Sequence, residues 1–214
     1  SLHVIYINTS LETKAISNII VPTITCTSSN VLNTLLSASA QIPNLDIYYG
    51  PDTYMGENLI TMLNVLSMQW SDEKIAKLHP SHNRDSLKTL RDSINVFPSG
   101  NCIVHHMFGE SVVESVREHY VDTYITAHLE VPGEMFEIAM EYSLKDRGVV
   151  GSTSDILKFI QRKVKESGSS QKLRFILGTE AGMVTSIVQG VQQYLKGDKQ
   201  VEIIFPVSSD AVNI

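Results

Sequence analysis

Three histidines and a glutamate stand at the ends of two runs that are typical of β-strands. His105 and His106 follow NCIV, and His128 follows YITA, with Glu130 two residues further on. Imidazoles and a carboxylate at strand ends can bind a metal ion, act as general acid and base, or bind a substrate carboxylate. The alternative for each histidine is a structural side chain held by hydrogen bonds, and the residues alone leave these choices open.

The histidines are concentrated in the middle of the chain, since six of the seven fall between residues 79 and 128. We expect His79 and His82 to be solvated within a polar segment. We expect His3 and His119 to lie on the surface.

Hydroxyl-bearing residues follow four of the predicted strands. These junctions are Asn8-Thr9-Ser10, Thr27-Ser28-Ser29-Asn30, Gly151-Ser152-Thr153-Ser154 and Gly178-Thr179-Glu180. Free backbone N–H groups and the helix dipole attract anions where a helix begins, although such residues also serve as ordinary N-caps. The sequence has neither a Walker A nor a GxGxxG phosphate loop. The four junctions therefore favour a small substrate that carries several carboxylates or a phosphate.

The chain has two cysteines, which is too few for a disulfide framework and indicates a reducing compartment. Cys102 begins the run that ends in His105, and Cys26 ends a predicted strand beside the Ser28 junction. A lone cysteine in a strand is usually a small buried apolar residue. Two cysteines cannot by themselves hold a four-ligand zinc or iron–sulfur site.

Alternating short β-branched runs and longer amphipathic runs must position these residues. The predicted strands are His3–Asn8, Thr23–Cys26, Asp46–Tyr49, Asn101–His105, Thr123–Ala127, Gly148–Val150, Arg174–Leu177 and Val201–Phe205. Stretches with apolar residues at a spacing near 3.6 separate most of them, for example Val31–Ser37, Val112–Val116 and Met135–Leu144. This alternation predicts an α/β fold of mostly parallel sheets with flanking helices, in which ligands bind at the carboxyl ends of the strands.

One polar stretch interrupts the alternation. Trp70–Phe97 is helical in places and contains His79-Pro80, so we interpret it as a helical insert or connector. We therefore expect two α/β lobes, residues 1–99 with a helical insert near 70–97, and residues 100–214. The short tail from Ser208 completes no further element, which suggests that the polypeptide has been cut there.

Composition excludes several classes of protein. The 214 residues are 43% hydrophobic and 19% charged, which is ordinary for a globular protein and wrong for a disordered one. Lysine and arginine number 17 against 23 acidic residues, and this balance argues against a nucleic-acid binder. No apolar run is long enough for a membrane helix, and no secretory signal is present. The chain does not begin with Met, so the true start can lie upstream.

Seven segments of the chain resemble quinolinate synthase, in the same order. They are VIYINTSLETKA, TCTSSNV, PDTYMGEN, GNCIVHHMFG, TAHLEVPGEM, VGSTSDIL and FILGTEAGMVT, and the resemblance runs from about residue 3 to residue 208. The HLEVPGEM wording and the Trp70–Phe97 insert are similar to plant and algal forms, which implies a plastid location, or a cytoplasmic one outside that branch.

The resemblance implies three similar α/β lobes around a pseudo-threefold axis, two of which this chain would supply. It implies a [4Fe–4S] cluster that three cysteines hold, with an open iron acting as a Lewis acid. The implied reaction condenses iminoaspartate with dihydroxyacetone phosphate to give quinolinate for NAD biosynthesis. A homodimer, L-aspartate oxidase as a partner and a sulfur-transfer domain upstream are further implications.

The resemblance assigns roles to residues at the polar junctions. Tyr6 and Asn8 match the Tyr-x-Asn of the family, which implies proton transfer for the tyrosine and substrate binding for the asparagine. Ser28 matches a serine that binds a carboxylate. Ser152 and Thr153 match hydroxyl groups that hold the substrate.

The central run receives roles in the same way. Cys102 matches a cluster ligand, and His105 matches a substrate-binding histidine. His128 and Glu130 match the His-x-Glu pair of the family, in which the glutamate acts in general acid/base catalysis. Leu129 stands where most relatives have proline.

The departures from the family lead to alternatives. The first lobe and two of the three cluster cysteines are not in this chain, so we expect part of a quinolinate synthase that does not assemble the cluster alone. The alternative is a non-catalytic, cluster-free homologue that binds small dicarboxylates or a partner chain. A generic Rossmann-type cofactor binder is disfavoured because the glycine fingerprint is missing.

Overall fold

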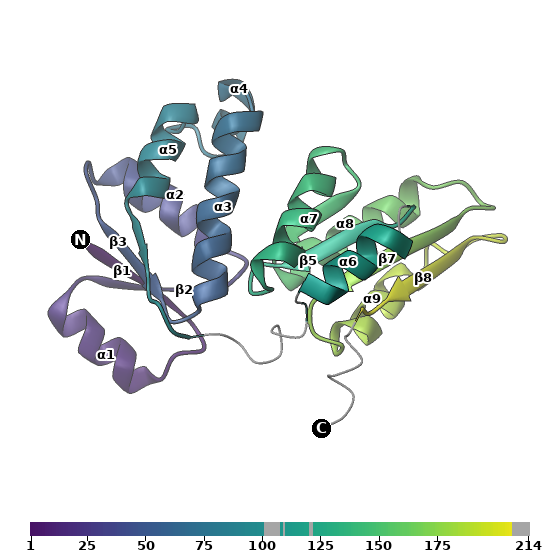
Figure 1. Ribbon diagram of the computed structural model, residues 1–214, viewed down its shortest axis with the longest axis horizontal. Coiled ribbons are helices and arrows are strands. Elements are labelled where there is room, and N and C mark those ends of the chain that lie inside the picture. The colour runs from purple at the N-terminus through teal and green to yellow at the C-terminus, as the bar shows by residue number, and fades with distance from the viewer. Residues whose placement is uncertain (101–107, 109, 120–121, 207–214) are drawn as a thin grey trace. The chain divides into compact units, whose positions relative to one another are not determined.

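The protein is described by a computed structural model that covers residues 1–100, 108, 110–119 and 122–206. The chain divides into two compact units, Ser1–Asn101 and Cys102–Ile214 (Figure 1). Each unit has a four-stranded parallel sheet with helices packed on it, which confirms the predicted α/β class. The predicted residues Cys102, His105 and His106 and the strand expected over residues 101–105 lie outside the described residues.

The first unit begins with a buried strand in the interior of its sheet. Its elements are β1 (Leu2–Tyr6), α1 (Leu11–Ile20), β2 (Thr23–Cys26), α2 (Val31–Gln41), β3 (Ile47–Gly50), α3 (Thr53–Gln69), α4 (Asp72–Leu78), α5 (Arg84–Asp92) and β4 (Ile94–Val96). The strand order is β2-β1-β3-β4. All five residues of β1 are buried, because strands pair with it on both edges and helices cover the sheet.

Local signals in the sequence start the helices of this unit. The Ser10 hydroxyl accepts a hydrogen bond from the backbone N–H of Thr13, and the Asp52 carboxylate accepts one from Met55 at 2.7 Å. Side-chain acceptors of this kind satisfy N–H groups that have no partner within the helix. Each cap lies in the short turn that follows a strand, and because β1 and β3 are parallel, both helices begin at the same end of the sheet.

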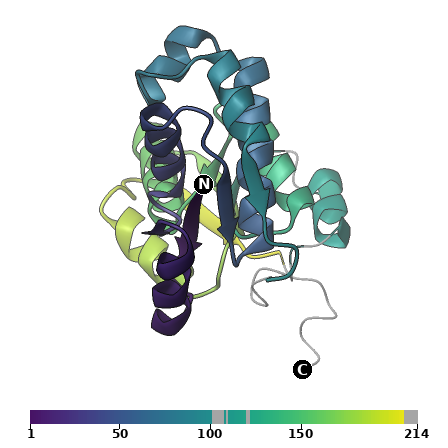
Figure 2. The same cartoon turned by 90° about the vertical axis from the view of Figure 1, so that its left-hand side faces the viewer.

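The polar stretch Trp70–Phe97 belongs to the first unit. It contains α4 and α5, as the helical prediction required, and α5 packs against α3. The stretch ends in β4, a strand that the sequence analysis missed and that pairs with β3. Figures 1 and 2 show α4 at the opposite end of this unit from α1.

The solvated state expected for His82 is wrong. The side chain is buried, its Nε2 lies 2.8 Å from the carbonyl oxygen of Leu36, and its Nδ1 lies 3.0 Å from Ser86 Oγ. His79 is half-buried and its ring contacts His82 edge to face. His82 therefore links the start of α5 to α2, and its role is structural.

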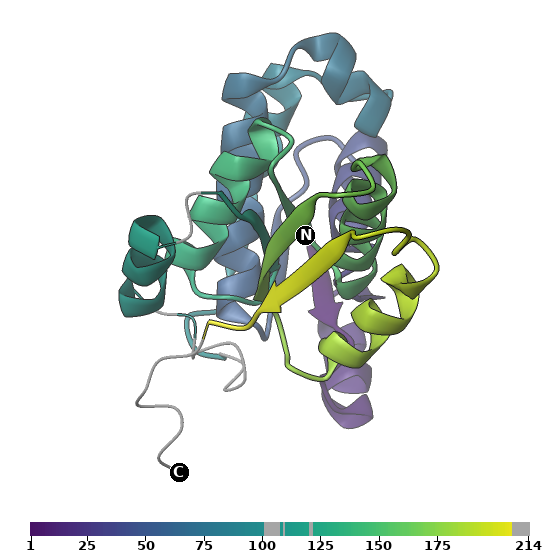
Figure 3. The same cartoon turned by 90° about the vertical axis from the view of Figure 1, so that its right-hand side faces the viewer.

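The second unit repeats the strand–helix pattern. Its elements are α6 (Glu110–His119), β5 (Tyr124–His128), α7 (Gly133–Leu144), β6 (Gly148–Gly151), α8 (Thr153–Glu166), β7 (Lys172–Gly178), α9 (Met183–Gln192) and β8 (Gln200–Ile204). The strand order is β6-β5-β7-β8. Figure 3 shows α6 and α7 on one face of this sheet and α8 and α9 on the other. The side chain of His119 is outside the described residues.

Apolar side chains of α8, β7 and α9 form the core on one face of the second sheet. They include Phe159, Ile160, Phe175 and Ile187, all buried. The other face has a close approach at Gly178, where an added Cβ would lie 2.5 Å from the carbonyl oxygen of Thr126. Only glycine fits there, so β7 ends tightly against β5. Among the described residues, no helix has the length and apolar character needed to cross a lipid bilayer.

Candidate functional site

The carboxyl end of β1 holds two of the predicted site residues. Tyr6 is the last residue of the strand and is buried, whereas Asn8 is exposed in the turn that follows. The Thr9 backbone N–H donates to the carbonyl oxygen of Tyr6 at 3.1 Å, and this contact closes the turn before Ser10 caps α1. The strand thus fixes Tyr6, and the turn presents Asn8 beside the N-terminus of α1.

Ser28 reaches the same edge of the sheet from the neighbouring strand. It is half-buried in the turn between β2 and α2, where the Asn30 side chain accepts a hydrogen bond from Thr27 N at 2.7 Å. Tyr6 pairs with Cys26 in the sheet register, so the turns that follow these two residues start side by side. The first unit therefore gathers Tyr6, Asn8 and Ser28 at one edge.

Cys26 itself is suited to the core and not to metal binding. The side chain is buried at the end of β2, and burial raises the pKa of its thiol to about 12. Metals bind the thiolate form of cysteine. At neutral pH Cys26 is a protonated apolar residue.

The carboxyl end of β5 places His128 and Glu130 together in the second unit. Both side chains are buried, and the backbone N–H of Glu130 donates to His128 Nδ1 at 3.3 Å. A ring nitrogen that accepts a hydrogen bond has no proton, so in the neutral ring the proton is on Nε2. The geometry thus selects the tautomer of this imidazole.

Ser152 and Thr153 stand at the start of α8, one strand away. The Ser152 hydroxyl donates to Asp155 Oδ2 at 2.6 Å, and its backbone N–H donates to the same oxygen at 2.9 Å. In this capping box, the Ser152 hydroxyl already donates its proton to a residue in the first turn of α8. Thr153 is half-buried in the first turn, and His128 pairs with Gly151 in the register, so the start of α8 lies beside the end of β5.

Thr179 is a residue of this edge that the assignment of roles from sequence did not include. It follows β7, and since Ala127 pairs with Gly178, Thr179 comes next to His128 at the sheet edge. Its Oγ1 is buried and has no hydrogen-bond partner among the described residues. Leaving a buried hydroxyl unsatisfied costs roughly 1–3 kcal/mol. The polar junction Gly178-Thr179-Glu180 was the signal in the sequence that marked it.

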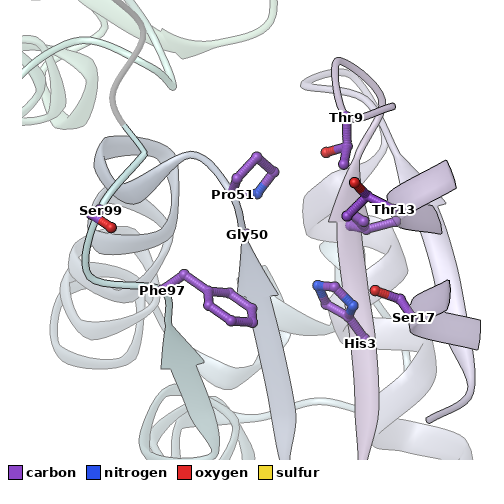
Figure 4. Close-up of a pocket in the computed structure, with 9 residues that line it drawn as sticks. His3, Thr9, Thr13, Ser17, Gly50, Pro51, Phe97 and Ser99 are labelled. Carbon is purple, nitrogen blue, oxygen red and sulfur yellow. The ribbon is translucent and has the colours of Figure 1, made fainter. Parts of the chain in front are cut away.

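The first unit has a cavity of about 270 Å³ between α1 and its sheet (Figure 4). Its lining is His3, Ile5, Thr9, Thr13, Ser17, Gly50, Pro51, Phe97 and Ser99. The surface position expected for His3 is wrong, because the residue is only 8% exposed in the interior strand β1. Burial lowers the pKa of its imidazole.

The structure therefore forms two groups of predicted residues, one in each unit. Tyr6, Asn8 and Ser28 belong to the first group, and His128, Glu130, Ser152 and Thr153 belong to the second. Both lie where strands end and helices begin, as expected for ligand sites in parallel sheets. Within the described part of the chain, no group of three or more His, Cys, Asp or Glu residues is arranged to hold a metal ion.

Comparison with known proteins gives a consistent result over nearly the whole chain. The family model described as Quinolinate synthetase A protein matches residues 1–202. A chloroplastic quinolinate synthase of Nicotiana tabacum is 53% identical over 223 residues, which cover 99% of this chain and 31% of that protein. The chloroplastic quinolinate synthase of Oryza sativa subsp. japonica is 52% identical over 100% of this chain and 31% of its own length.

An archaeal relative gives a more distant comparison. The quinolinate synthase of Sulfurisphaera tokodaii is 30% identical over 86% of this chain and 44% of its own length. The chain thus spans less than half the length of each of these three relatives.

Proposed function

Because this chain belongs to the Quinolinate synthetase A protein family, we propose that the protein containing it is a quinolinate synthase, a transferase of NAD biosynthesis. The proposed reaction condenses iminoaspartate with dihydroxyacetone phosphate and releases phosphate and water. The observation that carries the proposal is the family match over residues 1–202, together with 53% identity to a protein of that name. The polar strand ends of both units support it, since the substrates bring two carboxylates and a phosphate.

The first unit supplies groups for substrate binding and proton transfer. Asn8 is exposed at the edge, and Ser28 lies in the neighbouring turn before α2. A carboxylate at this edge would meet an amide, a hydroxyl and helix N-termini, which favour anions. The phenol of Tyr6, fixed at the end of β1, is the proposed proton-transfer group of this unit.

The second unit supplies the proposed acid/base pair. With Nδ1 of His128 accepting from Glu130 N, the Nε2–H of the neutral ring is the group that donates to a substrate oxygen. The carboxyl group of Glu130 accepts a proton from the substrate and returns it, and its burial suits this general acid/base role. Thr153 is the more accessible of the two hydroxyl groups at α8, because the Ser152 hydroxyl is engaged by Asp155. His105 is proposed as a further substrate ligand.

The residues of this chain do not by themselves fit a [4Fe–4S] cluster. Three thiolates are needed for the proposed cluster, the chain has two cysteines, and Cys26 is a buried, protonated thiol. Cys102 remains the proposed ligand from this chain. The other ligands would then belong to parts of the protein outside residues 1–214.

The remaining proposals concern the whole protein. Residues 1–99 and 100–214 are proposed as two of its three lobes. The name "chloroplastic" of the plant relatives supports a plastid location. A homodimer, a sulfur-transfer domain upstream and L-aspartate oxidase as the source of iminoaspartate are proposed partners. The excess of acidic residues supports the absence of nucleic acid as a partner, and we propose no membrane partner.

The test uses the complete protein after anaerobic reconstitution, with quinolinate formation and iron and sulfide content as readouts. We expect quinolinate to form and about four iron atoms to be bound per chain. Cys102→Ser should lose both iron and activity. Cys26→Ala, the matched control, should keep both. A complete protein that makes no quinolinate would overturn the proposed function in favour of a non-catalytic homologue.

A further inference from the structure

The cavity beside α1 is a candidate binding site that is separate from the proposed catalytic groups. Tyr6, Asn8 and Ser28 are not among its lining residues, although all belong to the same unit. Its volume of about 270 Å³ exceeds the roughly 150 Å³ of an apolar cavity that holds benzene. A ligand of about ten non-hydrogen atoms is therefore a reasonable fit.

One wall of the cavity is polar and has groups without partners. His3 Nε2 and Thr9 Oγ1 are buried and make no hydrogen bond to any described residue. Figure 4 shows His3 facing Ser17 of α1, with Thr13 and Thr9 above them. Because buried polar atoms in native proteins are almost always paired, the two unpartnered atoms point to a ligand that supplies the missing hydrogen bonds.

The apolar part of the lining includes the Phe97 ring, which lies next to His3 with the ring centroids 5.6 Å apart. The Phe97 ring lies against Gly50, where an added Cβ would be 2.4 Å from Phe97 Cδ2. Ile5, which lies on the same face of β1 as His3, and Pro51 add further apolar surface to the lining. The lack of a side chain at Gly50 lets the ring lie on the strand and so shapes a surface on which a planar group can stack.

The cavity has no formal charge. None of its nine lining residues is Asp, Glu, Lys or Arg. Burial lowers the pKa of His3, so its imidazole is neutral at pH 7. An ion would lose its hydration here without gaining a counter-charge, which disfavours carboxylates and ammonium groups alike.

We propose that this cavity binds a small uncharged planar molecule with a hydrogen-bond donor and acceptor along one edge, such as an aromatic amide. The amide edge bonds to His3 Nε2 and the Thr9 hydroxyl, and the ring stacks on Phe97. The chemistry required differs from that of the proposed substrates, which are anions. The site is therefore distinct from the proposed catalytic edge in both lining and selectivity.

The test follows backbone amide signals of the ¹⁵N-labelled 214-residue chain while benzamide is added. We expect saturable shifts at Thr9, Thr13 and Ser17. Benzoate, which differs by a negative charge, and toluene, which lacks the polar edge, should each bind at least tenfold more weakly. Equal binding of benzoate, or no saturable shift with benzamide, would overturn the proposal.

Variants locate the contact. Thr9→Val removes the proposed hydroxyl partner and should weaken benzamide binding about tenfold. Thr34→Val is the matched control, because the Thr34 hydroxyl donates to Asn30 O on the exposed face of α2. If Thr9→Val does not fold, Thr9→Ala takes its place, because it removes the same hydroxyl, and a weaker affinity is again expected. Unchanged affinity in the folded variant overturns the site.

The complete protein supplies the last control. If another part of the longer polypeptide fills the cavity, benzamide binds the 214-residue chain but not the complete protein, and the proposal is overturned. Binding to both supports it. Because the readout is binding and not turnover, failure here leaves the proposed synthase activity untouched.

Discussion

At the scale of single residues, hydroxyl groups in and near the proposed site of the second unit differ in whether they already donate a hydrogen bond. The Thr126 hydroxyl donates to Ile176 O at 2.8 Å, and the Ser152 hydroxyl donates to Asp155. Thr179 Oγ1 is buried and has no partner among the described residues. A hydroxyl in this state is available to a bound molecule, whereas the other two first have to break a hydrogen bond.

Thr126 and Thr179 lead to opposite predictions for the stability of the chain. Thr126→Val should lower the free energy of unfolding by about 1 kcal/mol, because it removes a satisfied hydrogen bond. Thr179→Val should leave that free energy unchanged or raise it, since it removes an unsatisfied group. Urea unfolding of the chain measures both. An equal loss in the two variants would mean that Thr179 already has a partner within the chain.

Single residues also show where prediction from sequence fails. Asn8, Ser28, His128 and Thr153 could be placed at strand ends because local patterns define where strands end. Tyr6, the last residue of β1, was expected inside a strand that reached Asn8. The burial of His3 and His82 could not be predicted. His3 contacts Phe97, and His82 bonds to Leu36 O, which is 46 residues earlier. Such partners are set by tertiary packing, which a local pattern does not record.

At the scale of elements, the alternation of strands and helices could be predicted from the sequence, but a very short strand could not. Runs such as Thr23–Cys26 and Tyr124–His128 are apolar or β-branched, and their strands were predicted within one residue. β4 is only Ile94–Val96, within a polar stretch, and its pairing with β3 stabilises it more than its own composition does. The predicted alternation was therefore correct for the other described strands, and it missed this edge strand.

The turn between α7 and β6 links two elements through charge. Asp146 has a positive φ of 56°, and its carboxylate bonds to Arg162 at 2.7 Å and to Lys163, both on α8. These hydrogen bonds, with the Arg162 contribution the larger, lower the pKa of Asp146 to about 2. The carboxylate is 62% exposed, so solvent screens the pair and its contribution to stability is below about 1 kcal/mol.

A pH dependence follows from that contact. A lowered folded-state pKa means that the stabilisation is present above the unfolded pKa of about 3.9 and is lost as the pH falls toward 2. Asp146→Asn keeps a residue that tolerates positive φ and removes the charge. We expect the variant to be slightly less stable at pH 7, with the difference shrinking at pH 3. Urea unfolding at both values checks this, and a difference that grows in acid contradicts it.

At the scale of the whole molecule, the first unit leaves an apolar face uncovered. α1 has no buried residue, and Ile16, Ile19 and Ile20, which lie within about 100° of one another around the helix, are 51%, 85% and 79% exposed. Soluble monomers rarely expose apolar residues in such a group. This chain spans 31% of the length of each of two plant relatives, so in a protein of that length other segments are available to cover this face.

We expect the isolated chain to self-associate through α1. The double variant Ile19→Glu and Ile20→Glu should lower the average mass in light scattering toward that of a monomer. Leu195→Glu is the control, because Leu195 is an exposed apolar residue that belongs to the second unit and not to α1. If the control acts as strongly as the double variant, self-association does not depend on this face.

Glu130 is the proposed acid/base group of a quinolinate synthase, and its contribution to turnover can be measured. The direct measurement is the kcat for quinolinate formation by the complete protein with Glu130→Gln, beside Glu134→Gln as a control. Glu130 is buried beside His128, whereas Glu134 is exposed in the first turn of α7. We predict a fall of at least about 100-fold for Glu130→Gln and a change below about twofold for Glu134→Gln. Wild-type kcat in Glu130→Gln would contradict the account.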